Sequence, residues 1–131
     1  MRYAQRDYVG KNVNFDQLQT MIANFFREEG FRVQCGKHPR GHIVQAKKGG
    51  IFRTVLAENR SYTITIEGTQ ANFKIKMGIA DWLQSLEPKI MDPIFESPML
   101  SFTETPEALW TYELEHHFWH YVETQVDLGI K

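Results

Sequence analysis

Apolar residues recur at helical spacing near the start of the chain. Between residues 15 and 26 they fall three or four positions apart, which predicts an amphipathic helix with one buried face. Asn14 is a suitable N-cap for this helix, and Gly30 is placed to end it in a left-handed conformation. The apolar stripe consists of Phe15, Leu18, Met21, Ile22, Phe25 and Phe26.

In the middle of the chain the period changes to two, which is typical of strands. Residues 61–67 and 73–77 each alternate between apolar and polar side chains, and residues 68–72 turn the chain between them. The pattern predicts an antiparallel hairpin with one buried face and one wet face. Further strands are expected over residues 3–11, 32–35 and 42–48, with a turn over residues 38–41.

The C-terminal third is predicted to be helical at two places. Asp81 is placed to cap a short helix that Pro88 limits, and Thr105 and Pro106 are placed to begin a long helix that ends near Asp127. The residues from 87 to 105 show no strong periodicity. We therefore expect a long connection there, and its apolar residues favour a cap on the core over a cover for a site.

The order of these elements predicts an α+β fold in one domain that covers residues 1–131. We expect a curved antiparallel β-sheet, with a long N-terminal helix and a long C-terminal helix packed on one face. This order resembles the helix-grip fold in reduced form. The likeness is one of fold alone and assigns no ligand.

The composition is that of a globular protein. Of the 131 residues 42% are hydrophobic, and the net charge is −1, so there is no global signal for polyanion binding. The one cysteine, Cys35, rules out an intramolecular disulfide and favours a reducing compartment. No signal-peptide core and no membrane-spanning apolar run are visible. We therefore expect a cytoplasmic protein with no transmembrane segment, whose contact with membranes is limited to surface attachment.

The charges are unevenly distributed along the chain. Residues 32–60 hold seven Lys or Arg against one acid, whereas residues 81–131 hold ten acids against two lysines. Mutual neutralisation of an acidic helix and a basic sheet edge is one interpretation of this division. The other is that the basic region meets an anionic partner.

Gly49 and Gly50 are central to this choice. They form either a two-residue hairpin turn, or the start of a helical segment over residues 51–56, where the apolar spacing suits a helix better than a strand. A helix start beside lysines would attract phosphate, sulfate or carboxylate. No Walker or dinucleotide-binding pattern is present. Both structures stay open, with the plain turn favoured. The residues of this hypothetical anion or partner site are Lys37, Arg40, Lys47, Lys48, Gly49, Gly50 and Arg53.

Several short motifs between residues 44 and 82 resemble a pattern in uncharacterised small prokaryotic proteins. They are VQAKKGG at 44–50, Arg53-Thr54, Tyr62-Thr63-Ile64, Phe73-Lys74-Ile75, Gly78 and Trp82. The resemblance implies no reaction. It suggests a core that works near membranes or other partners, although this chain lacks the Cys pairs and the spanning helix that some members carry.

Residues of the last predicted helix suggest two functions other than anion binding. Glu113 and His117 lie four residues apart, as do His116 and His120, which is a suitable spacing for metal ligands. This pattern offers a metal-dependent hydrolase as one alternative. A carrier of a small hydrophobic ligand is the other, with a cavity between sheet and helix lined by Trp110, Phe118 and Tyr121. The main hypothesis is a binding domain without enzymatic activity or cofactor. Its partner is an anionic molecule or a membrane headgroup, and nucleic acid stays open.

Overall fold

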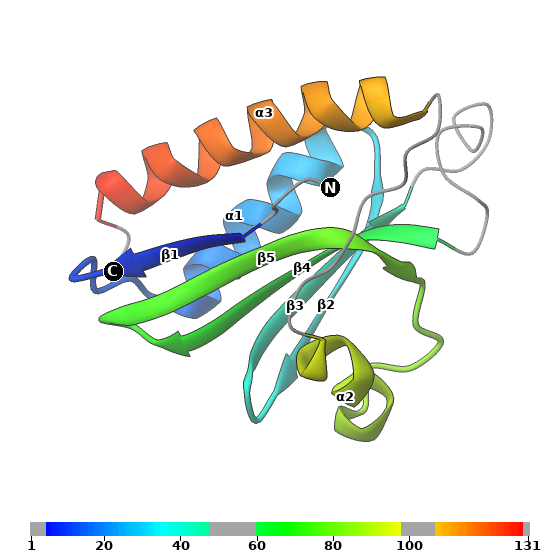
Figure 1. Cartoon of the computed structure of the whole chain (residues 1–131), viewed down its shortest axis with the longest axis horizontal. Helices are drawn as coiled ribbons and strands as arrows, with labels where there is room; N and C mark the ends of the chain where they lie inside the picture. The colour runs from blue at the N-terminus through cyan, green and yellow to red at the C-terminus, as the bar shows by residue number, and fades with distance from the viewer. Residues whose placement is uncertain (1–4, 48–59, 98–106, 130–131) are drawn as a thin grey trace.

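The protein has an α+β fold in which an antiparallel five-stranded sheet is combined with three helices (Figure 1). The computed structural model describes residues 5–47, 60–97 and 107–129, and the side chains of the last segment from residue 113 onward. The elements in chain order are β1 (Gln5–Val9), α1 (Phe15–Glu28), β2 (Arg32–His38), β3 (Gly41–Lys47), β4 (Arg60–Thr69), β5 (Asn72–Asp81), α2 (Pro88–Glu96) and α3 (Glu107–Asp127).

The strand order in the sheet is β1-β5-β4-β3-β2, so the first strand pairs with the last. The predicted hairpin is confirmed as β4 and β5, with Ile64 opposite Met77, and it extends further on both sides than the sequence pattern indicates. The predicted turn near residue 40 is also confirmed. It joins β2 to β3 with His38 opposite Gly41.

The predicted N-terminal helix is confirmed as α1, and its ends are fixed by local signals. The Asn14 Oδ1 atom accepts a hydrogen bond from the Gln17 backbone N–H at 3.0 Å, which caps the start of the helix. After the helix, Gly30 has a φ of +87° and the Phe31 N–H donates to the Phe26 carbonyl at 2.9 Å. The apolar stripe of α1 packs on β2 and β3.

α3 lies on the same side of the sheet as α1, but the expectation that both helices pack directly on the sheet is wrong for α3. α3 packs chiefly on α1, and it reaches β1 and the following loop through side chains such as Arg6 and Lys11. A third helix, α2, lies on the opposite side of the sheet, below it in Figure 1. The predicted start of the C-terminal helix, at Thr105 and Pro106, lies outside the described residues.

Two further expectations fail between residues 81 and 97. Asp81 ends β5 and caps no helix, and residues 82–87 are irregular. The stretch expected to be a connection instead contains α2, in which Pro88 occupies the first turn, where no backbone N–H is needed. Met91, Ile94 and Phe95 are buried on α2 and pack against Ile43 of the sheet.

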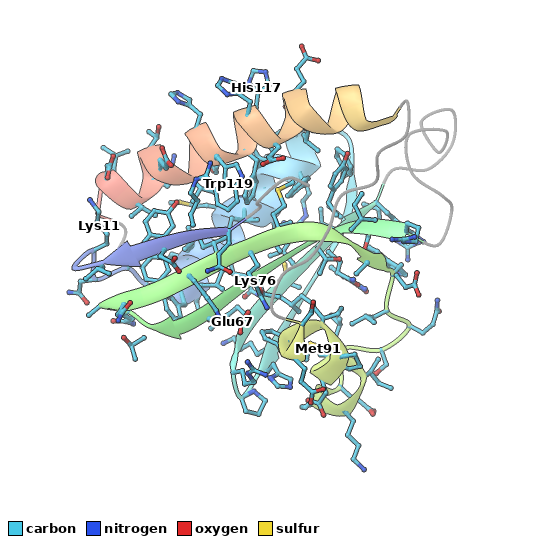
Figure 2. All side chains as sticks on the ribbon, in the orientation of Figure 1. Lys11, Glu67, Lys76, Met91, His117 and Trp119 are labelled. Carbon is cyan, nitrogen blue, oxygen red and sulfur yellow. The ribbon has the colours of Figure 1, made fainter. Side chains whose placement is uncertain are left out.

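The second face of the hairpin is buried, whereas the alternation predicted that it would be wet. Thr63 and Thr65 are fully buried, and the Lys76 side chain is 1% exposed. Figure 2 shows Lys76 and Glu67 side by side, and the Lys76 Nζ lies 2.9 Å from a Glu67 carboxylate oxygen. Lys76 also donates to the Ser97 carbonyl at 2.6 Å, just after α2. Each buried charge has a partner, which offsets part of the cost of its desolvation.

Candidate anion-binding site

The predicted basic residues lie at two ends of the β2–β3 hairpin and do not converge. Lys37 and Arg40 are beside the turn, whereas Lys47 ends β3. The six residues that separate position 41 from position 47 span about 20 Å in an extended strand. The other members of the predicted site, Lys48, Gly49, Gly50 and Arg53, lie outside the described residues, as does the segment 51–56.

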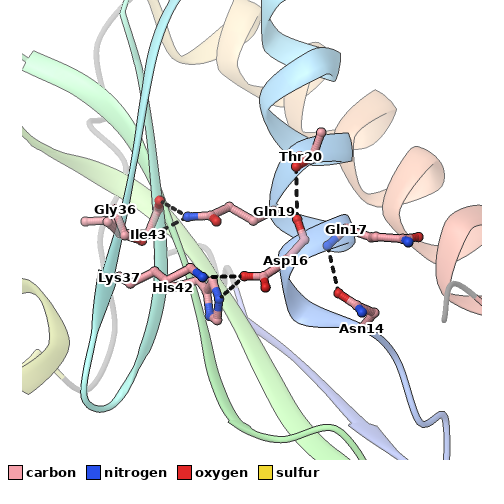
Figure 3. Close-up of polar contacts among 9 residues, drawn as sticks. All are labelled: Asn14, Asp16, Gln17, Gln19, Thr20, Gly36, Lys37, His42 and Ile43. Atoms are coloured by element: carbon pink, nitrogen blue, oxygen red, sulfur yellow. Dashed lines mark hydrogen bonds and ion pairs between the residues drawn. The ribbon is translucent and has the colours of Figure 1, made fainter.

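The two cations near the turn already have acidic partners. The Lys37 Nζ lies 2.9 Å from Asp16 of α1, and the Arg40 guanidinium lies 3.6 Å from Glu67. Asp16 also contacts His42 at 3.0 Å (Figure 3). The Lys37 ammonium and then the His42 ring lower the pKa of the Asp16 carboxyl by hydrogen bonding to it. This end of the hairpin is therefore largely neutralised.

The far end of the hairpin has a different arrangement. Arg32 lies directly opposite Lys47 on neighbouring strands, and both side chains extend over the indole ring of Trp82. The distances to the ring centroid are 5.4 Å for the Arg32 guanidinium and 4.6 Å for the Lys47 Nζ. Within the described residues neither cation has a carboxylate at ion-pair distance. We call Arg32, Lys47 and Trp82 the Trp82 site.

Like charges that are directly opposed on a sheet repel each other, and the indole ring partly offsets this repulsion. Arg60 of β4 is opposite Asp81 of β5, their charged groups are 3.6 Å apart, and the register places this pair on the other face of the sheet from Lys47. Arg32 and Lys47 therefore carry two positive charges over one ring, without a carboxylate at ion-pair distance among the described residues. The resulting excess of positive charge can attract an anionic group.

The backbone on both sides of Trp82 is held by glutamine side chains from the sheet. Gln45 of β3 donates to the Asp81 carbonyl at 2.9 Å and accepts from the Leu83 N–H at 3.0 Å. Gln34 of β2 donates to the Leu83 carbonyl at 3.0 Å. These bonds replace the helical hydrogen bonds that the sequence led us to expect, and they fix Trp82 beneath its two cations.

The position of Arg32 in this site could have been found from the sequence. A two-residue turn at Pro39-Arg40 sets the register of the hairpin, and counting outward from it places residue 32 opposite residue 47. Trp82 was not predictable in this way, because the irregular segment that carries it depends on hydrogen bonds to side chains distant in sequence.

The residues of the hydrophobic-cavity hypothesis pack together where the structure describes them. Phe118 is fully buried, and its ring centroid lies 5.7 Å from the Phe25 ring and 4.9 Å from the Trp119 ring. Tyr121 is partly buried against the same cluster, with its ring 5.4 Å from Phe25. The side chain of Trp110 lies outside the described part. Phe118 and Tyr121 therefore fill the space between α1 and α3.

The residues of the metal hypothesis are all exposed on α3. Glu113, His116, His117 and His120 face away from the core, and Figure 2 shows His117 directed away from the sheet. Among the described residues, no group of three or more His, Cys, Asp or Glu side chains is arranged to hold a metal ion. A hollow of about 300 Å³ beside His117 is also lined by Glu29, Glu113 and Leu114.

Comparisons with protein-family models, curated proteins and solved structures find no match to this chain. Within the described part of the structure, no helix is long and apolar enough to cross a membrane.

Proposed function

We propose that the protein is a non-enzymatic binding domain that recognises a phosphate-bearing partner through the Trp82 site. The observation that carries this proposal is the direct opposition of Arg32 and Lys47, which have no carboxylate partner among the described residues. Such an arrangement costs free energy in the isolated protein, because the two charges repel. An anion between them removes this cost.

The types of residue suit a phosphate group. The guanidinium of Arg32 can donate two parallel hydrogen bonds to phosphate oxygens, and the Lys47 ammonium adds a mobile point charge. The Trp82 ring lies under both cations, which limits the freedom that they lose on binding.

The phosphate can belong to a lipid headgroup or to a soluble molecule, and one experiment separates these sources. Sedimentation is measured with vesicles of phosphatidylcholine alone and with vesicles that also contain phosphatidic acid. Binding of inorganic phosphate and pyrophosphate is measured in parallel by calorimetry. Both series are repeated at increasing salt, which weakens charge-dependent binding.

Lys47→Glu is compared with Lys89→Glu, which makes the same change in charge at an exposed position of α2. We expect Lys47→Glu to weaken binding at least about tenfold, because a charge-assisted hydrogen bond is replaced by repulsion. Lys89→Glu should retain binding. Equal losses in the two variants would show an effect of net charge alone. If the wild-type protein binds neither phosphate nor vesicles at low salt, the proposal is wrong.

We also propose that the architecture is a reduced form of the helix-grip fold and that the protein acts in the cytoplasm. The pairing of the first strand with the last, and a C-terminal helix on the same side of the sheet as α1, support the first point. The single cysteine supports the second. An experimental structure and cell fractionation test these two points. The carrier and hydrolase hypotheses stay predictions.

A further inference from the structure

We infer that Gln45 is the positioning residue of the Trp82 site, an inference that rests on the proposed function. Gln45 is fully buried on β3, next to the edge strand β2, and its amide bonds to the backbone of the segment that carries Trp82. Its amide bonds to the backbone on both sides of Trp82, so its proposed role in anion binding is indirect. Its role is to fix the backbone that carries the ring.

The hydrogen bonds of Gln45 use every donor and acceptor position of its amide group. The Nε2 atom donates to the Asp81 carbonyl at 2.9 Å and to the Thr63 hydroxyl at 3.0 Å. The Oε1 atom accepts from the Leu83 N–H at 3.0 Å and from the Gln34 side chain at 2.9 Å. A primary amide has two donor hydrogens and two acceptor lone pairs, so all four positions are used.

Two of these four bonds lie on either side of Trp82. Asp81 is the last residue of β5, and from Trp82 to Glu87 the backbone belongs to neither a strand nor a helix. This segment therefore lacks the regular backbone hydrogen bonds of a strand or helix, which could otherwise orient the Trp82 ring. Gln45 supplies the carbonyl of Asp81 and the N–H of Leu83 with partners from inside the sheet.

Gln34 assists but cannot replace Gln45. It is only half-buried and bonds to the Leu83 carbonyl and to Gln45 itself, so it holds one side of Trp82. Without Gln45, two backbone groups beside Trp82 lose their partners, and the amide of Gln34 loses one. Unpartnered buried groups are costly, so the segment is expected to move until water reaches them.

The test replaces Gln45 with Met, which has a similar volume and no amide. All tryptophans are labelled as 5-fluorotryptophan, and Trp82→Phe identifies the fluorine resonance of Trp82. In Gln45→Met we expect this resonance to move toward that of a solvent-exposed indole without any ligand present. Affinity for inorganic phosphate should fall about tenfold, because the site is no longer preorganised.

Thr63→Val is the matched control. Thr63 is fully buried and bonds to Gln45, but the bonds to Asp81 and Leu83 do not involve it. We expect the control to lose stability while it retains the Trp82 resonance and the affinity. An unchanged resonance in Gln45→Met would overturn the inference. So would an equal loss of affinity in both variants at matched free energy of unfolding.

Gln45→Asn provides the same comparison if Gln45→Met does not fold. The shorter amide cannot reach both sides of Trp82, so the same shift of the resonance is expected. The fluorine measurement needs no ligand, which separates the two proposals. If wild-type protein binds no phosphate but the resonance still moves, the proposed function fails and the positioning role of Gln45 is supported.

Discussion

His38 and His42 lie on either side of the Pro39-Arg40 turn and bond to carboxylates on opposite faces of the sheet. His38 contacts Asp92 of α2, and His42 contacts Asp16 of α1 at 3.0 Å. The His38 ring also stacks on Phe95, with centroids 4.4 Å apart. The tip of the β2–β3 hairpin therefore contacts α2 through His38 on one face of the sheet and α1 through His42 on the other.

The two histidine–carboxylate contacts should differ in their effect on stability. The His38 side chain is 6% exposed, so Asp92→Ala leaves a buried ring nitrogen without its partner and should cost about 1–3 kcal/mol. The His42 side chain is 16% exposed and the Asp16 side chain is 64% exposed, so water can replace the lost partner and Asp16→Ala should change the free energy of unfolding less. Urea unfolding of both variants checks this order. Equal losses of unfolding free energy in the two variants would show that the burial of His38 does not determine the cost of removing its partner.

Removal of Lys37 should raise the pKa of Asp16 toward its ordinary value, because the Lys37 ammonium is the largest cause of its lowering. A lowered folded-state pKa means that this contribution to stability is present above the unfolded-state pKa. It is lost as the pH falls through the folded-state pKa. Carboxyl-detected NMR titration of wild type and Lys37→Ala measures the shift. An unchanged Asp16 titration in the variant would contradict the assignment.

Tyr8 should titrate far above an ordinary tyrosine. Burial, followed by the negative charge of Glu123, raises the pKa of Tyr8 to about 12. The unfolded chain then loses this proton first, near pH 10, so the free energy of unfolding should fall between about pH 10 and about pH 12. Absorbance at alkaline pH, compared between wild type and Tyr8→Phe, reports this titration. A difference spectrum that develops near pH 10 would contradict it.

The same substitution should leave the protein as stable as wild type at neutral pH or make it more stable. The Tyr8 hydroxyl is buried without a hydrogen-bond partner in the described structure, whereas its ring stacks on Phe73 at 5.1 Å. Tyr8→Phe keeps the ring and removes the unpartnered group, which should add up to about 1 kcal/mol. Thermal unfolding at pH 7 measures the change. A clear loss of stability would indicate that the hydroxyl has a partner in solution.

The buried pair of Glu67 and Lys76 should show strong coupling. Lys76→Met leaves the Glu67 carboxylate, which is 5% exposed, without its ammonium partner and should cost about 3–5 kcal/mol. The double variant Glu67→Gln/Lys76→Met should cost less than the sum of the single changes, because no buried charge remains and Arg40, the other partner of Glu67, is half exposed. A double-mutant cycle in urea measures the coupling. Additive effects would show that the two groups do not depend on each other.

The parts of the fold that follow from local signals are predictable from the sequence. α1 carries its own cap at Asn14 and its own stop at Gly30, and the hairpin of β4 and β5 carries a clear alternation. α2 has a helical stripe of Met91, Ile94 and Phe95, but Pro93 within it conceals the signal. Proline inside a helix normally argues against helix formation, and here the packing on Ile43 outweighs it.

Other features depend on contacts that no local pattern contains. Alternation along β5 assigns Lys76 to one face of the sheet, but it does not say whether that face is covered. Burial of Lys76 follows from its partners, which are Glu67 on the neighbouring strand and Ser97 just after α2. In the candidate site, Lys47 was selected from the sequence, whereas Trp82 depends on Gln45 reaching across the sheet.

The pairing of β1 with β5 has a consequence for biosynthesis. Gln5 pairs with Lys76, so β1 leaves the ribosome 71 residues before its partner, by the difference of the two positions. At about 5–20 residues per second, this interval lasts several seconds. Throughout that time the edge of β1 has no strand to pair with, while β2, β3 and β4 can already associate. β1 is synthesised first, but it can therefore join the sheet only after β5 has been made.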